Sequence, residues 1–353
     1  MEERALRVLT LTRLQGFGPR RLASLVRVGG IDEVYEKPRR FAHLIGPVAL
    51  RRLEDHSARR EAERVFDQAK GKGQSVIVLD SPEYPTSLAA LYDPPPVLFL
   101  RGLLRREVRR VAIVGARGAT PWGRSFARDL ARGLAARGIE VISGLARGID
   151  GAAHEGALSG KGSTLAVLGS SVDIIYPGEH VDLAGRIEKS GGVLSELPPG
   201  TGPTAAQFPS RNRIIVGLSE AVVVVEAGAK SGALITARVA LEEGRDVLAV
   251  PGRPADPLAF GPNLLLRDGA VLTRGTEDVL EHLGLVSTPS QAAGRAADPI
   301  LEKLAHSAPK SVDQLAVDTG LAPPLLIARL SELEIDGKIE RLPGTLFRSA
   351  SPA

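Results

Sequence analysis

The chain has 353 residues, of which 43% are hydrophobic and 24% charged, a composition that excludes extensive disorder. At about 100–200 residues per domain this length predicts two or three domains. The sequence contains no Cys, which excludes disulfides, Cys-ligated metal centres and a thiol nucleophile. The charged start Met1-Glu2-Glu3-Arg4 is unlike a signal peptide, and the apolar run Ala221–Val225 is far too short to span a membrane. We therefore expect a cytoplasmic protein with no membrane contact.

The positive charge, net +4, is unevenly distributed along the chain. Residues 1–74 hold 16 basic and 10 acidic residues, and residues 101–137 hold 10 and 2. The remainder of the chain is net acidic. Positive charge confined to two segments favours a localised anionic partner, and a solvated Arg-rich face is the alternative interpretation.

Residues 1–74 form the first predicted domain, an all-α domain of short helices. Apolar residues recur there at helical spacing, as in Leu6, Leu9 and Leu14. The stretch Leu14–Leu22 resembles a helix-hairpin-helix, in which a Gly-rich turn points backbone N–H groups at a phosphate. The turn Gly16–Gly18 is therefore a candidate secondary contact to duplex DNA, and a plain packing role is the alternative.

Residues 75–285 form the second predicted domain, in which β-branched runs alternate with helical stretches. This alternation predicts an α/β fold with a Rossmann-like, doubly wound and mostly parallel sheet. The predicted strands are Val76–Leu79, Val97–Leu100, Val111–Val114, Ile139–Ile142, Leu165–Leu168, Val193–Leu194, Ala221–Val225 and Val247–Val250. Helices such as Trp122–Ala136 and Leu234–Glu243 separate them.

The small, polar residues 286–298 predict a linker, and residues 299–353 a third domain. Helices are expected over Pro299–His306, Ser311–Val317 and Pro323–Asp336, followed by a β-hairpin over Gly337–Arg348. That is the order of elements in a winged helix. The third helix is apolar and acidic with Arg329 as its only basic residue, which favours a protein partner over duplex DNA for this module.

Gly-rich and small residues follow several predicted strands. They form four loops: Gly115-Ala116-Arg117, Ser143-Gly144 with Arg147, Gly169-Ser170, and Lys230-Ser231-Gly232. In a parallel sheet such loops share one edge, where N–H groups and cations bind anions. A dinucleotide fingerprint is not met, because Arg117 occupies the second Gly position, and no Walker A loop is present. Several anion sites along one edge suit a chain of phosphates.

Evidence for catalysis is weak. Ser143, Asp150 and His154 could form a triad, but Asp150 as a helix cap and His154 as a packed residue are favoured. The triplet Arg211-Asn212-Arg213 is either an active-site clamp or a binder of phosphates and base edges. Glu226 at a strand end is ambiguous. No His pair has the spacing of a metal site, and we expect no cofactor, no metal and no enzymatic activity.

Ordered motifs over residues 110–280 resemble the DNA-processing protein A (DprA/Smf) family. They are Val111-Ala-Ile-Val-Gly-Ala-Arg117, Ser143-Gly-Leu-Ala-Arg-Gly-Ile-Asp150 with Ala153-His154, Leu165-Ala-Val-Leu-Gly169, Asp173-Ile-Ile-Tyr-Pro177, Leu194-Ser-Glu196, Phe208-Pro-Ser-Arg-Asn-Arg-Ile-Ile215, Ser231-Gly-Ala-Leu-Ile-Thr-Ala237 and Val250-Pro-Gly252. Many relatives carry a sterile-alpha-motif-like domain before this region and a winged helix after it. The resemblance implies a non-enzymatic protein that binds and protects incoming single-stranded DNA. It also implies loading of the RecA recombinase in natural transformation and homologous recombination.

The resemblance also implies site residues and a homodimer. Carried over by position, the phosphate-lining residues are Arg117, Ser143, Gly144, Arg211, Arg213, Lys230, Ser231 and Gly232. The run Leu264-Leu265-Leu266 matches part of the dimer contact, with ordinary core as the alternative. One departure is that Gly178-Glu179-His180 follows Tyr176-Pro177, where relatives often carry Lys or Asn, so one basic contact is missing.

Two other functions remain open. One is a Rossmann-like phosphoribohydrolase that cleaves bases from nucleotide monophosphates. Such enzymes resemble this fold but carry a Pro-Gly-Gly-x-Gly-Thr stretch, whereas Pro251-Gly252 is followed here by Arg253-Pro254. The other is a duplex-binding regulator that uses the winged helix.

Overall fold

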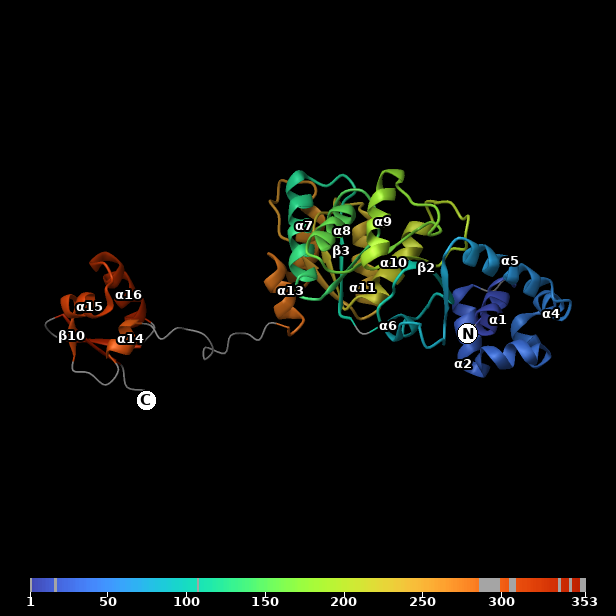
Figure 1. Ribbon diagram of the computed structural model, residues 1–353, viewed down its shortest axis with the longest axis horizontal. Helices are drawn as coiled ribbons and strands as arrows, with labels where there is room; N and C mark the ends of the chain where they lie inside the picture. Colours follow the sequence, from blue (N-terminus) through green and yellow to red (C-terminus); the bar gives the residue numbers. More distant parts are fainter. Residues whose placement is uncertain are drawn as a thin grey trace. The chain divides into compact units, whose positions relative to one another are not determined.

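A computed structural model of the chain describes residues 2–15, 18–106, 108–285, 299–304, 309–335, 338–342 and 345–349. The chain forms two compact units, Met1–Leu285 and Val286–Ala353, labelled by element in Figure 1. The expected linker, residues 286–298, lies outside the described residues. Residues 1–74 and 75–285 fall within one unit, so a domain boundary at residue 74 stays a prediction.

The unit Met1–Leu285 begins with helices. They are α1 (Glu2–Thr12), α2 (Pro19–Glu36), the 3-10 helix η1 (Pro38–Phe41), α3 (Ala42–Ile45), α4 (Pro47–Glu54) and α5 (Ser57–Gly71). Leu9, Leu11 and Leu22 are buried among them, as the helical spacing of apolar residues predicts. Gly18 caps the start of α2, whereas Gly16 of the predicted hairpin turn lies outside the described residues.

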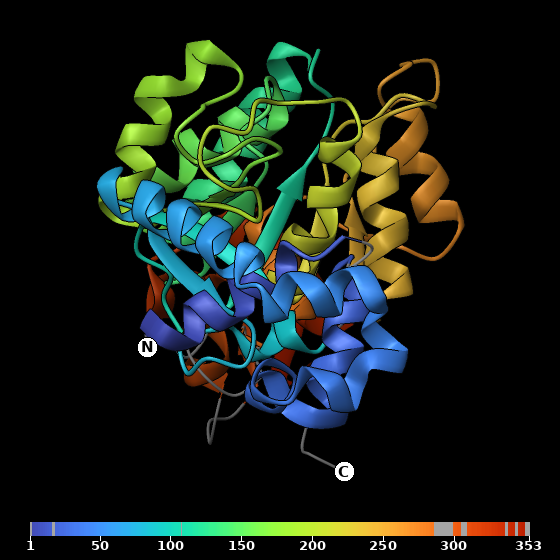
Figure 2. The ribbon, with the colours of Figure 1, turned by 90° about the vertical axis from the view of Figure 1, so that its right-hand side faces the viewer.

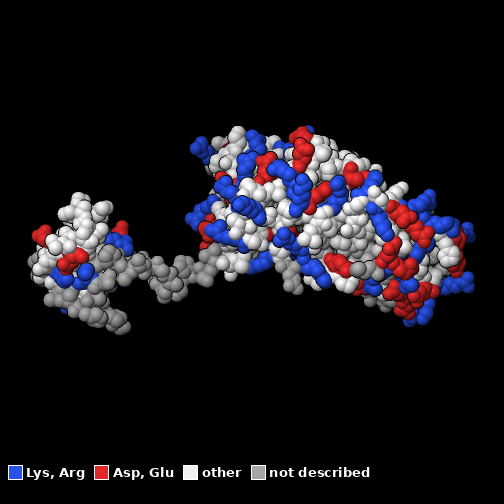
Figure 3. Space-filling view, viewed as in Figure 1, with Lys and Arg blue, Asp and Glu red and all other residues white. Residues whose placement is uncertain are grey.

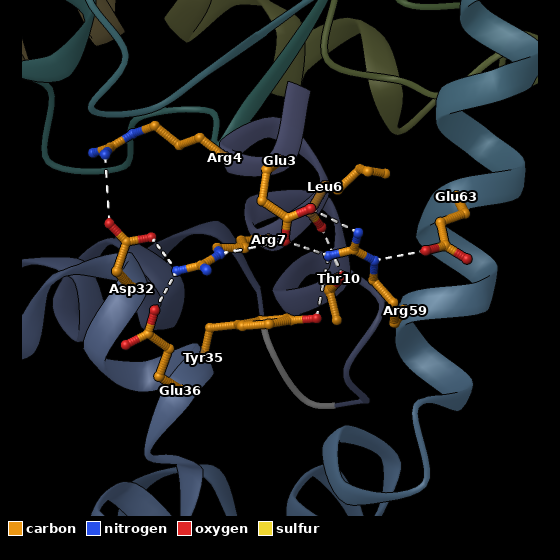
Figure 4. A network of polar contacts seen from close by, with 10 residues as sticks. All are labelled: Glu3, Arg4, Leu6, Arg7, Thr10, Asp32, Tyr35, Glu36, Arg59 and Glu63. Atoms are coloured by element: carbon orange, nitrogen blue, oxygen red, sulfur yellow. Dashed lines mark hydrogen bonds and ion pairs between the residues drawn. The ribbon is translucent and has the colours of Figure 1, made fainter. Parts of the chain in front are cut away.

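Arginines of these helices are used in internal ion pairs (Figure 4). Arg59 on α5 donates to both carboxylate oxygens of Glu3 on α1, at 2.8 and 2.9 Å. Hydrogen bonding to Arg59 lowers the pKa of Glu3 to about 2. Arg7 joins Asp32 at 2.9 Å and Glu36 at 2.8 Å on α2. Part of the basic excess of residues 1–74 is therefore neutralised within the fold.

A nine-stranded sheet forms the core of the same unit. Its strands are β1 (Ser75–Val78), β2 (Val97–Gly102), β3 (Arg110–Val114), β4 (Glu140–Ser143), β5 (Thr164–Val167), β6 (Gly192–Ser195), β7 (Ala221–Val224), β8 (Asp246–Ala249) and β9 (Val271–Leu272), in the order β1-β2-β6-β5-β4-β3-β7-β8-β9. The strands from β6 to β9 in that order run parallel, and β2 pairs antiparallel with both β1 and β6. The predicted doubly wound, mostly parallel sheet is confirmed. The two-residue β9 was not predicted, because it is too short to give a pattern.

Helices cover both faces of this sheet. On one face α7 (Pro121–Ala135), α8 (Ile149–Ser159) and α9 (Val181–Ser190) pack side by side, and α10 (Gln207–Leu218) and α11 (Gly232–Glu242) pack on the other (Figures 1 and 2). Shorter helices are α6 (Thr86–Ala89), η2 (Gly178–His180), α12 (Phe260–Arg267) and α13 (Thr276–His282). From β3 the chain winds toward β4, and from β7 it winds the opposite way toward β8. The adjacent strands β3 and β7 therefore mark the topological switch point, where ligands bind in such sheets.

The unit Val286–Ala353 has winged-helix order. It contains α14 (Pro299–Leu304), β10 (Lys310–Ser311), α15 (Val312–Thr319), α16 (Pro323–Ile335), β11 (Ile339–Leu342) and β12 (Leu346–Ser349), with a sheet in the order β10-β12-β11. Leu315, Leu330 and Phe347 are buried in its core. The predicted three helices and hairpin are confirmed, and β10 adds a strand. Within the part of the chain that the structure describes, no helix combines the length and apolarity that a membrane span requires.

Candidate nucleic-acid interface

A cleft of about 590 Å³ opens at the switch point of the sheet. Its walls come from the loop after β3, the beginning of α8, the beginning of α10 and the loop that leads into α11. These elements are far apart in sequence and meet only because parallel strands end at a common edge. Of the predicted site residues, the cleft brings together Gly115, Ala116, Arg117, Arg211, Asn212, Lys230, Ser231 and Gly232.

Glycines allow the loops after β3 and β4 to approach closely. A Cβ on Gly115 would overlap the side chain of Ile149. Gly148 has a φ of +77°, and a Cβ there would overlap the carbonyl oxygen of Ala116. The amide of Ala116 donates to the carbonyl of Glu226 at 2.7 Å, which fixes this loop against the end of β7. The floor of the cleft is therefore backbone held in place by close packing.

Arg117 is exposed at the side of the cleft. Its guanidinium lies over the ring of Phe208 on α10, 4.8 Å from the ring centroid, in a cation–π arrangement. Phe208 in turn contacts Tyr176, with 5.7 Å between ring centroids. Among the described residues Arg117 has no carboxylate partner, so its N–H groups are available to an anion.

Lys230 and the N-terminus of α11 form the opposite wall. The Ser231 hydroxyl accepts a hydrogen bond from the amide of Ala233 at 3.3 Å and so caps the helix. Gly232 begins the helix, and the helix dipole places partial positive charge there. The exposed ammonium of Lys230 precedes it, with no ion pair in the part of the chain that the structure describes. This wall has the composition of an anion site.

Arg211 is buried at the base of the cleft rather than extended toward solvent. Its guanidinium donates to the carbonyls of Gly144, at 2.7 Å, and of Val167. Burial lowers the pKa of Arg211 to about 10 and raises the pKa of the nearby, buried Asp150. Asp150 accepts from the amide of Gly144 at 3.2 Å. Arg211 and Asp150 thus hold the loop after β4 beneath the site.

The other predicted site residues do not line the cleft and have protein partners. Arg213 pairs with Glu196 at 2.5 Å and Asp93 at 3.7 Å, and Arg147 pairs with exposed Glu179 at 2.7 Å. The hydroxyls of Ser143 and Ser170 both donate to backbone carbonyls, at 2.6 Å. Gly144 and Gly169 pack under Arg211 and Phe208 respectively. Their role as phosphate contacts stays a prediction.

The catalytic alternatives find little support in the geometry. The Ser143 hydroxyl is bonded to the carbonyl of Ile113, and His154 Nδ1 lies 2.7 Å from the Thr164 hydroxyl, so neither faces the other as in a triad. Glu226 accepts from the amide of Thr120 at 2.9 Å and from its hydroxyl at 2.5 Å. That carboxylate fixes the N-terminus of α7. No cluster of metal-ligating side chains occurs among the described residues.

The basic segment 101–137 contributes less free positive charge than its composition suggests. Basic side chains over α7 and α8 are interspersed with acidic ones in Figure 3. On α7, Arg128 pairs with Glu155 at 2.8 Å and Arg132 with Asp129 at 2.7 Å. These arginines are partly neutralised, whereas Arg117 of the same segment is not. Within this segment the candidate anion site is therefore the cleft beside Arg117.

Phe208 was missed as a site residue by sequence reasoning. It lies one turn before Arg211 and Asn212 on α10, so helical spacing from a predicted site residue is the signal that could have identified it. Thr236 on α11 and Leu258, which also line the cleft, carry no such signal.

Known proteins share the sheet domain and the winged helix of this chain. Residues 75–284 match the family model of DNA recombination-mediator protein A, and residues 287–345 match that of the DprA winged helix domain. Protein Smf of Escherichia coli is 40% identical over 287 residues, covering 77% of each chain. The X-ray structure of DNA processing protein A (DprA) from Streptococcus pneumoniae superposes with a TM-score of 0.68 at 33% identity, covering 78% of this chain and 97% of that one.

A second solved structure concerns DNA processing protein A from Helicobacter pylori and its single-stranded DNA binding mode. It superposes with a TM-score of 0.54 at 30% identity, covering 60% of this chain and 95% of that one. A doubly wound sheet with an open cleft at its switch point, followed by a winged helix, defines a Rossmann-like protein with a winged-helix domain. The chain belongs to the DNA recombination-mediator protein A (DprA/Smf) family.

Proposed function

We propose that the cleft binds the phosphates of single-stranded DNA. The observation that carries this proposal is the pairing of two unneutralised cations, Arg117 and Lys230, with the capped N-terminus of α11 around one open cleft. Phosphates bind to such groups irrespective of base sequence. The Helicobacter pylori relative, whose reported single-stranded DNA binding mode concerns the same fold, supports this assignment.

Single strands fit this cleft better than duplex DNA. The exposed ring of Tyr176, which contacts Phe208 beside the cleft, offers an aromatic face to an unpaired base, as proteins that bind single strands without sequence preference use. The exposed ion pair of Arg147 with Glu179 contributes little to stability, so a phosphate can replace the Glu179 carboxylate there. Arg213 is held by two carboxylates and acts behind the cleft by positioning α10.

The wider role follows the family resemblance. We propose that the protein protects incoming single strands, loads RecA in natural transformation and homologous recombination, and acts without catalysis as a homodimer in the cytoplasm. Leu264, Leu265 and Leu266 on α12 are half-buried within the single chain, which leaves part of their surface for a dimer contact. RecA loading is measured as faster RecA-dependent ATP hydrolysis on DNA already coated with single-strand-binding protein.

A salt series tests the DNA-binding proposal. With three to five phosphates contacted at about 0.7 counterions each, log K should fall against log[salt] with a slope of roughly −2 to −3.5 per protomer. Fluorescence anisotropy of labelled oligothymidine gives the affinities. Unlabelled single strand should compete better than unlabelled duplex, which separates this function from that of a duplex-binding regulator. An affinity that is independent of salt would falsify the proposal.

A further inference from the structure

A second cleft of about 700 Å³ adjoins the phosphate cleft. Its lining residues are Thr120, Trp122, Pro251, Gly252, Arg253 and Asp256. The two clefts share two loops: the loop from Gly115 to Thr120 and the loop from Pro251 to Leu258 each contribute residues to both. The amide of Ala227 donates to the carbonyl of Leu258 at 2.7 Å, which joins the second loop to the end of β7. Both clefts therefore lie at the same edge of the sheet.

Trp122 is the feature of this second cleft that packing does not explain. It is the only Trp in the chain and is 54% exposed. Its ring packs against that of Phe126, one turn along α7, in a tilted arrangement with 5.4 Å between centroids and 32° between the planes, so one side of the ring is supported by protein. An aromatic ring with one face packed against protein and the other exposed can act as a stacking platform for a base.

The start of α7 is anchored so that the platform is fixed. The Thr120 hydroxyl accepts from the amide of Gly123 at 2.9 Å, and Glu226 binds both the amide and the hydroxyl of Thr120. A Cβ on Gly123 would overlap the Glu226 carboxylate, so this turn lies directly on Glu226. The backbone that carries Trp122 is therefore fixed between these two anchored residues, and Phe126 supports its ring. Such preorganisation lowers the entropic cost of binding.

The two clefts differ in net charge, so they suit different parts of a DNA strand. The phosphate cleft holds Arg117, Arg211 and Lys230 against the single carboxylate of Asp150. The second cleft holds Arg253 and Asp256, whose charges balance. Balanced charge beside an exposed aromatic ring suits a nucleobase, which is neutral and offers hydrogen-bond donors and acceptors, better than a phosphate.

We propose that Trp122 stacks on a base of the same single strand whose phosphates occupy the neighbouring cleft. This inference rests on the proposed function, because it requires that DNA occupies the phosphate cleft. From Arg117 to Trp122 the chain spans at most about 18 Å, so a strand that leaves Arg117 reaches the ring within a few nucleotides. Arg253 lies beside the stacked base, and none of the residues that the structure describes pairs with its guanidinium.

The absence of other Trp residues makes the test direct, since all tryptophan emission reports position 122. Oligothymidines of two to eight nucleotides are titrated into the full-length protein while emission and the anisotropy of a labelled strand are followed in parallel. We expect saturable quenching that begins only above a minimum length, with a midpoint equal to that of the anisotropy curve. Abasic strands of equal length should raise anisotropy without quenching.

The DNA affinity of variants at position 122 provides a second test. Trp122→Ala should weaken binding of long strands by roughly 5- to 100-fold, the range for loss of one base stack, and should leave the affinity for the shortest strands unchanged. Trp122→Phe should recover most of the loss. Tyr92→Ala removes another exposed aromatic that lines neither cleft and serves as the matched control.

The outcomes separate the two proposals. DNA that binds by anisotropy without quenching, or abasic strands that quench as well as thymidine, overturn the stacking inference and leave phosphate binding intact. Absence of binding by anisotropy overturns phosphate binding, and the stacking inference with it.

Discussion

The guanidinium carbon of Arg117 lies 4.8 Å from the centroid of the Phe208 ring, which joins the loop after β3 to the beginning of α10. The cation–π contact holds the long side chain over the ring and leaves the edges of its guanidinium free for hydrogen bonds. Arg117, one of the cations that the sequence analysis assigned to the site, is thus preorganised without being neutralised.

Arg117→Ala should weaken single-strand binding roughly 10- to 100-fold, because it removes a charge-assisted contact to phosphate. The loss should be similar for strands of different base sequence, since phosphates carry no sequence information. The melting temperature should stay unchanged, because the side chain is exposed and bound to no carboxylate in the described part of the chain. Anisotropy titration and thermal melting of one preparation provide both measurements.

The exposed arginine Arg186 on α9 lines neither cleft, so Arg186→Ala is the matched control. A destabilised Arg117→Ala protein that loses binding in proportion would instead mean that Arg117 braces the loop. Normal melting with unchanged affinity would remove Arg117 from the site.

Lys230→Gln should flatten the salt dependence of binding. Each cation that neutralises a phosphate of a single strand contributes about 0.7 to the slope of log K against log[salt]. Loss of Lys230 should therefore reduce the magnitude of the slope by about that amount, whereas Lys189→Gln, at an exposed position of α9, should not. A slope identical to that of the unaltered protein would show that no phosphate lies at Lys230.

The architecture was predictable because it depends on local patterns. Residues 111–114 of β3 and the whole of β7 are uninterrupted β-branched or small apolar runs, and the Gly-rich segments after them predict loops at one edge. The switch point follows from the order of strands, which the pattern alone does not give. The sequence therefore indicated four candidate loops, and the structure was needed to show that Gly115–Arg117 and Lys230–Gly232 line one cleft.

The availability of individual cations could not be predicted from the sequence, because partners distant in sequence decide whether a cation is neutralised. Arg213 and Arg211 are two positions apart on α10, yet Arg213 is paired with Glu196 and Arg211 is turned inward to the carbonyl of Gly144. No local sequence pattern around Arg211 or Arg213 predicts these contacts. Phe208, by contrast, was overlooked because an apolar residue on a helix usually packs in a core.

Arg211→Met should destabilise the fold rather than only the interface. It removes the donor to the carbonyls of Gly144 and Val167 and leaves the buried Asp150 without its neighbouring cation. Leaving a buried carbonyl without its hydrogen-bond donor typically costs about 1–3 kcal/mol of unfolding free energy. Urea denaturation measures it. Adding Asp150→Asn should recover part of the loss in a double-mutant cycle, and additive effects would contradict the coupling.

Nucleotide monophosphates, ATP and NAD should remain intact when incubated with the protein. Glu226, whose role the sequence left ambiguous, accepts hydrogen bonds from the amide and hydroxyl of Thr120. Chromatographic detection of free base is the measurement. Base release that disappears in Glu226→Gln would establish a phosphoribohydrolase instead of a non-catalytic protein.

His154 should make the fold sensitive to acid. The Thr164 hydroxyl donates its single proton to the carbonyl of Val141 at 2.7 Å, so His154 Nδ1, 2.7 Å from that hydroxyl, must be the protonated nitrogen that donates to it. The other nitrogen, Nε2, is buried without a partner among the described residues. Burial lowers the pKa of His154 to about 3, so the native state holds this imidazole neutral.

The unfolding free energy should fall as pH falls, because protons bind His154 more tightly in the unfolded state than in the folded state. A group whose pKa is depressed by folding contributes stability above its unfolded pKa, near 6.5, and that contribution is lost as pH falls toward the folded pKa of about 3. One proton corresponds to about 1.4 kcal/mol of unfolding free energy per pH unit within this window. Urea denaturation at several pH values between 7 and 4 should show it. His154→Asn keeps a neutral donor toward Thr164 and should give a curve less steep by one proton, whereas parallel curves for the two proteins would show that His154 does not titrate on unfolding.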